Sequence, residues 1–443
     1  ESSNQEIKDQ INEEEEQNMD DAVIAAQRLS EAEYALSKID NDIGMRVPKY
    51  AQLRNPSPIS LSVAQEFCGK NRCILEYVIA SSKSYCIVIT DKKSYIVELD
   101  DTYDYSSSVT KLHDAVAAMK PERNFERVRN ELYEKLVAPL SSYIKGKKSV
   151  LIVPDANLAL LPFEILRSDS DSKMLGEQFS VALSPSVSVS YISKQINVTG
   201  SSVFALGGAW YDSSLTEDEH NYVLSNGVLV TGEAYPNMRT RSENKTGWND
   251  LPGTMTELSL LKNSVFVRQE FFSLTQKDAT EHNIKKLSEQ GQLAKFSIVH
   301  FACHGYFNRP NNNQPTAILL SEVSTSITDS DEDGYLTIPE ATLLNLNADL
   351  VCLSACETGI VESDESDDMS GLSRAFMVAG AKHVAVSLWE ASDVAAAEFM
   401  TRMYKNVLKG MDYSTAYKTV KAEFRRNDDW SHPFYWALYT IYE

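Results

Sequence analysis

Short apolar runs alternate with segments of helical periodicity along the second half of the chain. The apolar runs predict strands at Ser202–Leu206, Val265–Phe271, Phe296–Ala302, Leu350–Ser354, His383–Leu388 and Ala437–Tyr442. The periodic segments predict helices at Thr254–Lys262, Ala279–Gln290, Ile338–Leu344, Ser370–Ala379, Val394–Leu408 and Tyr413–Arg425. This alternation indicates an α/β fold in which helices cover both faces of a central, mostly parallel sheet.

The first half of the chain predicts a smaller α/β lobe. Its strands and helices are expected at Cys73–Ala80, Tyr85–Thr90, Ser94–Leu99, Val109–Met119, Phe125–Tyr143 and Ser149–Val153. Residues 1–45 are acidic and have helical spacing, which fits either the end of a longer helical array or a solvated helix. We therefore expect a helical segment at 1–45, an N-terminal α/β lobe at 46–200 and a catalytic domain at 201–443, with more chain upstream.

Charge and composition narrow the class of protein. The chain has 63 acidic and 42 basic residues, a formal net charge of −21, so we expect no direct binding to nucleic acid. No apolar run is long enough to cross a bilayer and no signal peptide is evident, so we expect a cytoplasmic protein without a membrane contact. The 6 cysteines do not suggest a disulfide framework in a chain of 443 residues, which agrees with a reducing compartment.

Two predicted strands end in reactive side chains. His304 and Gly305 follow the strand at Phe296–Ala302, and Cys356 follows the strand at Leu350–Ser354. Reactive groups of open α/β sheets collect beyond the carboxyl ends of strands. A thiol becomes a nucleophile as thiolate, and an imidazole can accept its proton. We predict a His304/Cys356 catalytic pair, with the backbone amides of Gly305 and Cys356 as an oxyanion hole.

Position along the strand separates this pair from other candidates. His300 and Cys352 stand mid-strand and are expected to be core residues, and Cys303 is expected to point away from His304 because side chains alternate. Three further histidines have no partner pattern and are expected at the surface: His113, His220 and His282.

The sequence resembles CHAT-domain proteins, which are relatives of caspases and separase. The resemblance begins with the two segments around the predicted pair, H-F-A-C-H-G and L-S-A-C-E-T-G. It extends over about residues 46–443 through ordered motifs at 153–155 (VPD), 161–164 (LPFE), 251–254 (LPGT, then Glu257), 333–337 (DGYLT), 371–376 (GLSRAF), 387–389 (SLW, then Asp393) and 432–437 (HPFYWA). One departure is an acidic run at 362–368.

The resemblance implies a caspase-like three-layer fold and a cysteine endopeptidase with a His/Cys dyad and no cofactor. It implies selective cleavage of protein substrates, activation by a partner or sensor region, and tetratricopeptide-type helical repeats upstream. Some proteins of this family act in bacterial defence, so an RNA-guided defence complex is one candidate partner. The alternative is a catalytically silent caspase-like scaffold that serves as a protein-interaction module.

Two further features allow more than one interpretation. Trp389 and Asp393 follow the strand at His383–Leu388, where caspase-like enzymes form a substrate pocket. Asp393 suggests a preference for a basic residue, or else caps the following helix. The spacing of Asp329, Asp331, Asp333 and Glu340 matches an EF-hand calcium loop, but an acidic turn is the favoured interpretation, because the preceding residues predict strand and not helix.

Overall fold

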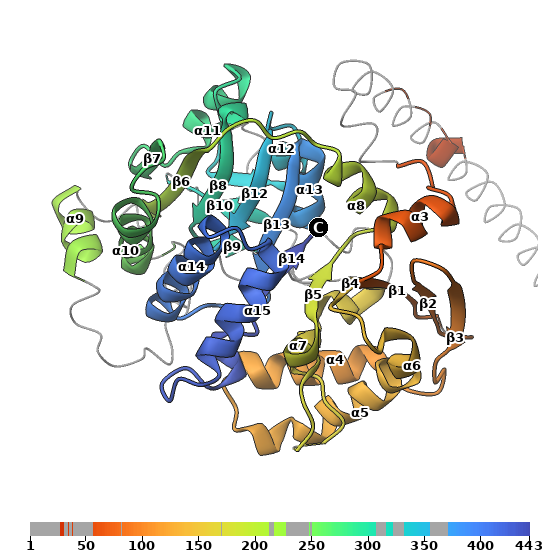
Figure 1. Cartoon of the computed structure of the whole chain (residues 1–443). Helices are drawn as coiled ribbons and strands as arrows, with labels where there is room; N and C mark the ends of the chain where they lie inside the picture. The colour runs from red at the N-terminus through yellow and green to blue at the C-terminus, as the bar shows by residue number, and fades with distance from the viewer. Residues whose placement is uncertain are drawn as a thin grey trace, which may run out of the picture. The chain divides into compact units, whose positions relative to one another are not determined.

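The computed structural model describes residues 27–30, 34, 38, 56–80, 82–169, 171–211, 217–226, 248, 250–306, 316–321, 332–354 and 371–443 (Figure 1). The chain divides into two units, Glu1–Pro56 and Ser57–Glu443. In the first unit, residues 27–30, 34 and 38 are helical.

A single eleven-stranded sheet forms the centre of the second unit, in the order β3-β2-β1-β4-β5-β14-β13-β12-β8-β6-β7. The strands are β1 (Arg72–Val78), β2 (Tyr85–Ile89), β3 (Ser94–Glu98), β4 (Ser149–Val153), β5 (Ser180–Leu183), β6 (Ser202–Ala209), β7 (Phe271–Gln276), β8 (Phe296–Ala302), β12 (Ala348–Leu353), β13 (Ala381–Ser387) and β14 (Tyr439–Tyr442). The predicted α/β fold with a central, mostly parallel sheet is confirmed.

Nine strands of the sheet form two parallel groups that run in opposite directions, and β2 and β3 extend one edge with antiparallel pairing. Strands β7, β6, β8, β12 and β13 are parallel to one another, as are β1, β4, β5 and β14. The groups meet where β13 pairs antiparallel with β14. The carboxyl ends of the two groups therefore lie at opposite edges of the sheet, so β8, β12 and β13 bring their carboxyl ends to one edge.

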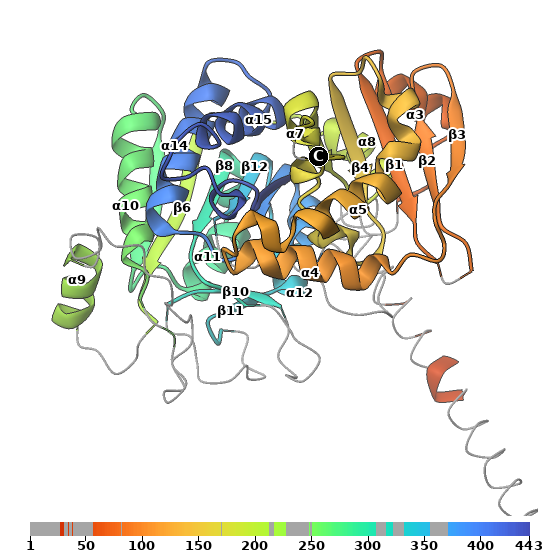
Figure 2. The same cartoon turned by 90° about the horizontal axis from the view of Figure 1, so that it is seen from below.

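Helices cover both faces of the sheet. Figure 2 shows α14 and α15 on one side of the strands and α12 on the other. The helices are α3 (Leu61–Cys68), α4 (Tyr105–Ala117), α5 (Glu126–Leu136), α6 (Ser141–Ile144), α7 (Leu175–Gln178), α8 (Val187–Lys194), α9 (Glu217–Asn226), α10 (Pro252–Leu260), α11 (Glu281–Glu289), α12 (Ile338–Thr342), α13 (Gly371–Ala379), α14 (Asp393–Leu408) and α15 (Tyr413–Phe424). Within the described residues, none of these helices is both long and apolar enough to span a bilayer.

A second, three-stranded sheet continues directly from β8. It has the order β11-β10-β9 and consists of β9 (Gly305–Tyr306), β10 (Ala317–Leu319) and β11 (Tyr335–Thr337), all antiparallel. Since β9 begins one residue after His304, this small sheet fixes the backbone on the far side of that histidine.

Most predicted elements of the second half lie within two residues of their observed positions. The strand predicted at Val265–Phe271 is wrong: a π-helical turn, Leu261–Val265, ends α10, and β7 begins at Phe271. Strand β5 and helix α3 were not predicted. The boundary expected at residue 200 stays a prediction, although strands from both sides of it share the one sheet.

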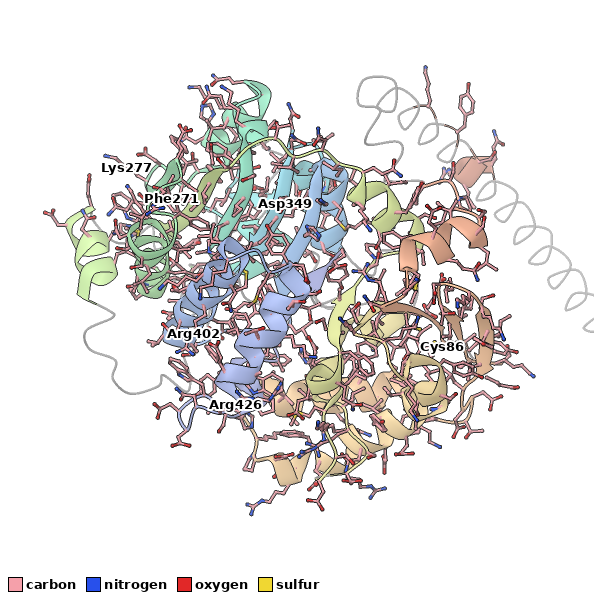
Figure 3. The ribbon with its side chains drawn as sticks, in the orientation of Figure 1. Cys86, Phe271, Lys277, Asp349, Arg402 and Arg426 are labelled. Atoms are coloured by element: carbon pink, nitrogen blue, oxygen red, sulfur yellow. The ribbon has the colours of Figure 1, made fainter. Side chains whose placement is uncertain are left out.

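Apolar packing sets the helices against the sheet. Leu258 of α10 packs on Ala205 of β6 and Ala302 of β8, and Phe271, labelled in Figure 3, packs against this cluster. The five described cysteines are buried free thiols: Cys68, Cys73, Cys86, Cys303 and Cys352.

A buried ion pair joins the first half of the chain to the second. The ammonium of Lys421, on α15, donates to the carboxylate of Glu164 at 2.5 Å and to the carbonyl of Tyr439, on β14, at 2.6 Å. Lys421 is 3% exposed. A side chain at Gly176 would come within 2.6 Å of the Glu164 Cβ atom, so the backbone packs closely around this pair.

We predict that Lys421→Met lowers the free energy of unfolding by about 3–5 kcal/mol, because it leaves the buried Glu164 carboxylate without its cation. Chemical denaturation measures this change. The control is Lys83→Met, which removes the exposed ion pair with Glu98 and is expected to change stability little. Equal losses in the two variants would contradict this view of the pair.

Candidate functional site

The carboxyl ends of β8 and β12 lie side by side. The strands are parallel and in register, with Leu353 opposite Phe301, and the Ser354 N–H donates to the Phe301 carbonyl at 2.8 Å. In the sequence, His304 and Cys356 each come three residues after the Phe301–Leu353 pair. Cys356 and the acidic run at 362–368 lie outside the described residues.

His304 is buried in an aromatic environment. It is 1% exposed, and its ring lies 4.6 Å from that of Tyr211 and 5.1 Å from that of Trp248, measured between centroids. Its backbone N–H donates to the Tyr211 hydroxyl at 3.1 Å, and that hydroxyl donates to the Leu319 carbonyl at 3.1 Å. The Leu319 N–H donates back to the His304 carbonyl at 2.9 Å. The Tyr211 hydroxyl thus bridges the two strands at the catalytic candidate.

The same register orients the backbone of Gly305. Gly305 stands opposite Ile318, one residue beyond the His304–Leu319 hydrogen bond. In antiparallel pairs, hydrogen-bonded and non-hydrogen-bonded positions alternate, so the Gly305 N–H points away from β10. Because β9 is the edge strand of the small sheet, that N–H faces outward, as an oxyanion donor requires.

A buried acid holds Tyr211 in place. The Asp250 carboxylate, whose side chain is fully buried, accepts from the Tyr211 N–H at 2.8 Å and from the His220 ring at 2.5 Å. His220 stacks on Trp210 at 4.7 Å. The expectation that His220 lies at the surface is therefore wrong. The sequence contained no local signal for it, because its partner lies 30 residues away.

A small cavity of about 40 Å³ lies at the same edge of the sheet. Its walls come from the start of α10, the ends of β8, β12 and β13, and the start of α14. Its charged side chains are Glu257, Glu390 and Asp393, all acidic, and its smaller polar side chains include Ser354 and Cys303. Cys303 thus faces this cavity, whereas His304 contacts Tyr211 and Trp248. Burial, and secondarily the Glu257 carboxylate, raises the pKa of the Cys303 thiol, so Cys303 stays protonated.

Asp393 reaches the cavity from the first turn of α14. The alternative that it caps this helix is wrong, because Ser392 holds the N-cap position. Burial, and then the Glu257 carboxylate, raises the pKa of Asp393, while a hydrogen bond from the Gly253 backbone opposes this shift. A Cβ atom at Gly253 would lie 2.2 Å from Cβ and Cγ of Asp393, which explains the glycine of the LPGT motif.

Trp389, expected to line the pocket with Asp393, does not line this cavity. It is 2% exposed, its Nε1–H donates to the Phe434 carbonyl at 3.0 Å, and its ring contacts His113. The His113 ring in turn bonds the Leu388 carbonyl at 2.9 Å, so the prediction that His113 lies at the surface is also wrong. His282 has a side chain that is 56% exposed, as predicted.

His300 and Cys352 are both fully buried, as predicted. His300 also has polar partners inside the protein. Its Nε2 lies 3.0 Å from the Glu257 carboxylate, and its Nδ1 lies 3.1 Å from the Tyr404 hydroxyl. Burial works against its charged form, yet Cys352 and Glu257 together raise the pKa of His300 to about 10. The other Glu257 oxygen accepts from the Ser354 hydroxyl at 3.2 Å, which connects the pair to the end of β12.

The described carboxylates of the predicted calcium loop already bind neighbouring protein groups. Glu340 accepts from the Thr337 N–H at 2.9 Å and from Lys285 at 2.8 Å, and Asp333 accepts from the Tyr335 N–H at 3.0 Å. Among the described residues, no group of three or more His, Cys, Asp or Glu is arranged to hold a metal. Asp329 and Asp331 lie outside the described residues, so calcium binding by this loop stays a prediction.

Comparison with known proteins places the chain in a family. The model of the CHAT domain matches residues 126–443. The chain belongs to the CHAT domain family. The match begins later than residue 46, where the motif resemblance was expected to start.

Two curated proteins and several solved structures are similar to parts of the chain. Tetratricopeptide repeat protein 28 of Homo sapiens is 22% identical over 76% of the chain, and the protein of the same name from Mus musculus is 22% identical over 70%. The chain spans 14% and 13% of the length of these relatives.

Among solved structures, the Saccharomyces cerevisiae separase–securin complex matches with a TM-score of 0.48 and 9% identity, over 86% of this chain and 31% of that chain. The Arg-specific cysteine proteinase gingipain R matches with a TM-score of 0.38 and 10% identity, over 76% of this chain and 73% of that chain.

We predict that Tyr211→Phe lowers the free energy of unfolding by about 1–3 kcal/mol, because it leaves the buried His304 N–H and Leu319 carbonyl without their bridging hydroxyl. Chemical denaturation measures the loss. The control is Tyr133→Phe on α5, a half-buried tyrosine far along the chain from this edge. A Tyr211→Phe variant as stable as the control would contradict the bridging role.

Proposed function

We propose that this chain is the catalytic part of a cysteine endopeptidase that cleaves selected proteins with a His304/Cys356 dyad. The observation that carries the proposal is the parallel register of β8 and β12, since His304 and Cys356 follow the same registered pair at the same sequence distance. Membership of the CHAT domain family and the buried, braced position of His304 support it.

In the proposed reaction, His304 accepts the thiol proton of Cys356, and the thiolate attacks the carbonyl carbon of the scissile peptide bond. The tetrahedral oxyanion accepts hydrogen bonds from the backbone N–H groups of Gly305 and Cys356. His304 then gives the proton to the departing amine, which leaves an acyl-enzyme thioester. Water, deprotonated by His304, hydrolyses the thioester and restores the thiol. The steps need no metal.

We further propose that the cavity beside β12 receives a basic side chain before the scissile bond. Asp393 and Glu257 line it, and Ser354 stands two residues before Cys356 in the sequence. A guanidinium or ammonium that entered the cavity would pair with buried carboxylate, where charge-assisted hydrogen bonds are strong. This assignment keeps Asp393 in the role expected from sequence and replaces Trp389 by Glu257.

Regulation by a partner or sensor region remains part of the proposal. The human and mouse relatives are named for tetratricopeptide repeats, and the chain spans a small share of their length. Such repeats give a binding surface on which an activating protein, a defence complex included, can act. A silent scaffold is the second candidate, and active-site labelling distinguishes the two.

We predict that an electrophilic peptide probe with a basic residue labels the protein, and that Cys356→Ala abolishes labelling. Cys303→Ala and Cys352→Ala serve as matched controls and are expected to retain it, because both thiols are buried. Mass spectrometry of the labelled peptide identifies the modified cysteine. Labelling of Cys303, or equal labelling without Cys356, would refute the dyad.

We predict that Asp393→Asn reduces the preference for arginine over citrulline at the cleavage site by about tenfold to a hundredfold, as expected for a lost charged hydrogen bond. The measurement is kcat/KM for two peptides that differ only at this residue. Because the pKa of Asp393 is raised, the wild-type preference should fall on acidification at a higher pH than an ordinary aspartate would give, as the carboxylate takes up a proton.

The matched control for this prediction is Glu398→Gln, an acidic residue of the same helix whose partner is Arg402. Its arginine preference should equal that of the wild type. If Asp393→Asn also left the preference unchanged, the cavity would not be the site of the basic residue.

A further inference from the structure

The cavity at the end of β12 adjoins a buried ion pair, His300 and Glu257, that has no role in the proposed dyad. His300 is fully buried in the middle of β8, where a charged imidazole is costly unless a counter-charge offsets it. Glu257, 3% exposed, supplies that counter-charge at 3.0 Å. The pair therefore lies inside the protein with one side of its carboxylate on the cavity wall.

The groups around the pair come from every neighbouring element. Those that can titrate are Glu257 from α10, His300 from β8 and Cys303 just after it, Cys352 from β12, Glu390 before α14, Asp393 and Tyr404 from α14, Tyr417 from α15 and Tyr439 from β14. His300 is the one cation in this set. With Glu257, Glu390 and Asp393 all ionised, the set carries two net negative charges.

Neighbouring side chains contact both ends of this pair. Nδ1 of His300 lies 3.1 Å from the Tyr404 hydroxyl, and Nε2 lies 3.0 Å from the Glu257 carboxylate as an ion-pair contact without an aligned hydrogen bond. Ser354 holds the second carboxylate oxygen at 3.2 Å. The Glu257 carboxylate thus contacts His300 of β8 and Ser354 at the end of β12. The ends of these two paired strands also lead to the proposed dyad.

Without His300, the cavity would hold two buried carboxylates close enough to influence each other, since Glu257 already raises the pKa of Asp393. Like charges in one buried site share a proton, so one carboxylate would become neutral. The cavity would then keep only one of these two carboxylate charges in the pH range where a peptidase works. A buried cation next to Glu257 prevents this.

We propose that His300 is a positioning residue for substrate selection: as a buried imidazolium, it holds the Glu257 carboxylate ionised on the cavity wall, so that the cavity accepts a cationic side chain. The selection of a cationic side chain rests on the proposed function. The charge state of His300 does not, and it can be measured in the resting protein.

The first experiment is a pH titration of the histidine ring signals by NMR, with 13C- and 15N-labelled histidine in the full chain and His300→Gln for assignment. The wild-type His300 ring should remain charged up to about pH 9, well above the ordinary histidine pKa of about 6.5. Glu257→Gln should move its titration downward by more than about one pH unit. The proposal would be overturned if the wild-type His300 ring titrated near the ordinary histidine value, or if Glu257→Gln left its titration unchanged.

Stability against pH gives a second readout with a definite sign. The pKa of His300 is raised to about 10 in the fold, so the pair stabilises the protein fully below about pH 6.5 and loses its contribution as the pH rises toward 10. The wild-type melting temperature should therefore fall more between about pH 6.5 and about pH 10 than that of Glu257→Gln. Parallel pH profiles in the two proteins would count against a charged pair.

The functional experiment compares kcat and KM for matched peptides with arginine or citrulline before the cleavage site. His300→Gln and Glu257→Gln should each reduce the arginine preference by about tenfold or more, mainly through KM, and Tyr404→Phe should do so less. Thr401→Val, a buried polar residue one turn earlier on α14, is the matched control and should keep the wild-type preference. An equal loss for both peptides would indicate a structural role and refute the proposal.

The ring titration and the peptide kinetics together separate this inference from the function on which it rests. If the wild type cleaves neither peptide and Cys356 takes no label, the proposed peptidase fails, and substrate selection by the cavity fails with it. The ring titration still decides whether His300 is the charged partner of Glu257.

Discussion

The parallel pairing of β8 with β12 is the constraint on which the candidate site depends. It sets Leu353 opposite Phe301 and brings two strand ends to one edge, from segments about fifty residues apart in the chain. Backbone hydrogen bonds leave little freedom in that register, because a slip of one residue would turn each buried side chain to the opposite face. The same register places His300 opposite Cys352, one residue earlier along each strand.

Around this pairing, two groups of buried polar side chains form connected sets. Asp250 holds Tyr211, which bridges His304 to the small sheet, and Glu257 joins His300 to Ser354. Buried polar groups that are fully paired define one arrangement, whereas a half-satisfied set costs more than an apolar core. These sets connect α10, β8 and the small sheet at the edge where the proposed dyad would lie.

The reversal of strand direction between β13 and β14 has a further consequence. It allows the first half of the chain to extend the sheet without placing its strand ends near the site. Lys421 of α15 pairs with Glu164 and also donates to the Tyr439 carbonyl of β14. The first half of the chain is therefore joined to the second through backbone pairing of β5 with β14, the Lys421–Glu164 ion pair and the His113–Leu388 hydrogen bond.

Sequence pattern was sufficient for the elements whose apolar spacing is regular. The strand at Phe296–Ala302 is observed with its predicted bounds, and α14 begins one residue before its predicted start. It failed at Val265–Phe271, where the apolar residues belong partly to a π-helical turn, because a short apolar run does not distinguish a buried strand from a buried helix end. It also missed β5, whose four residues are too few to show a period.

By itself, the sequence determined the α/β class, the family resemblance and the choice of His304 and Cys356, since each depends on residue types at short, fixed spacings. Only the tertiary structure decided that Trp389 lies away from the cavity and that Glu257 lines it instead. It also turned His300 from a core residue into the partner of a buried acid. Local spacing cannot reveal such contacts, because they join α10, β8 and α14, and the low polarity that makes them strong exists only once these elements are packed.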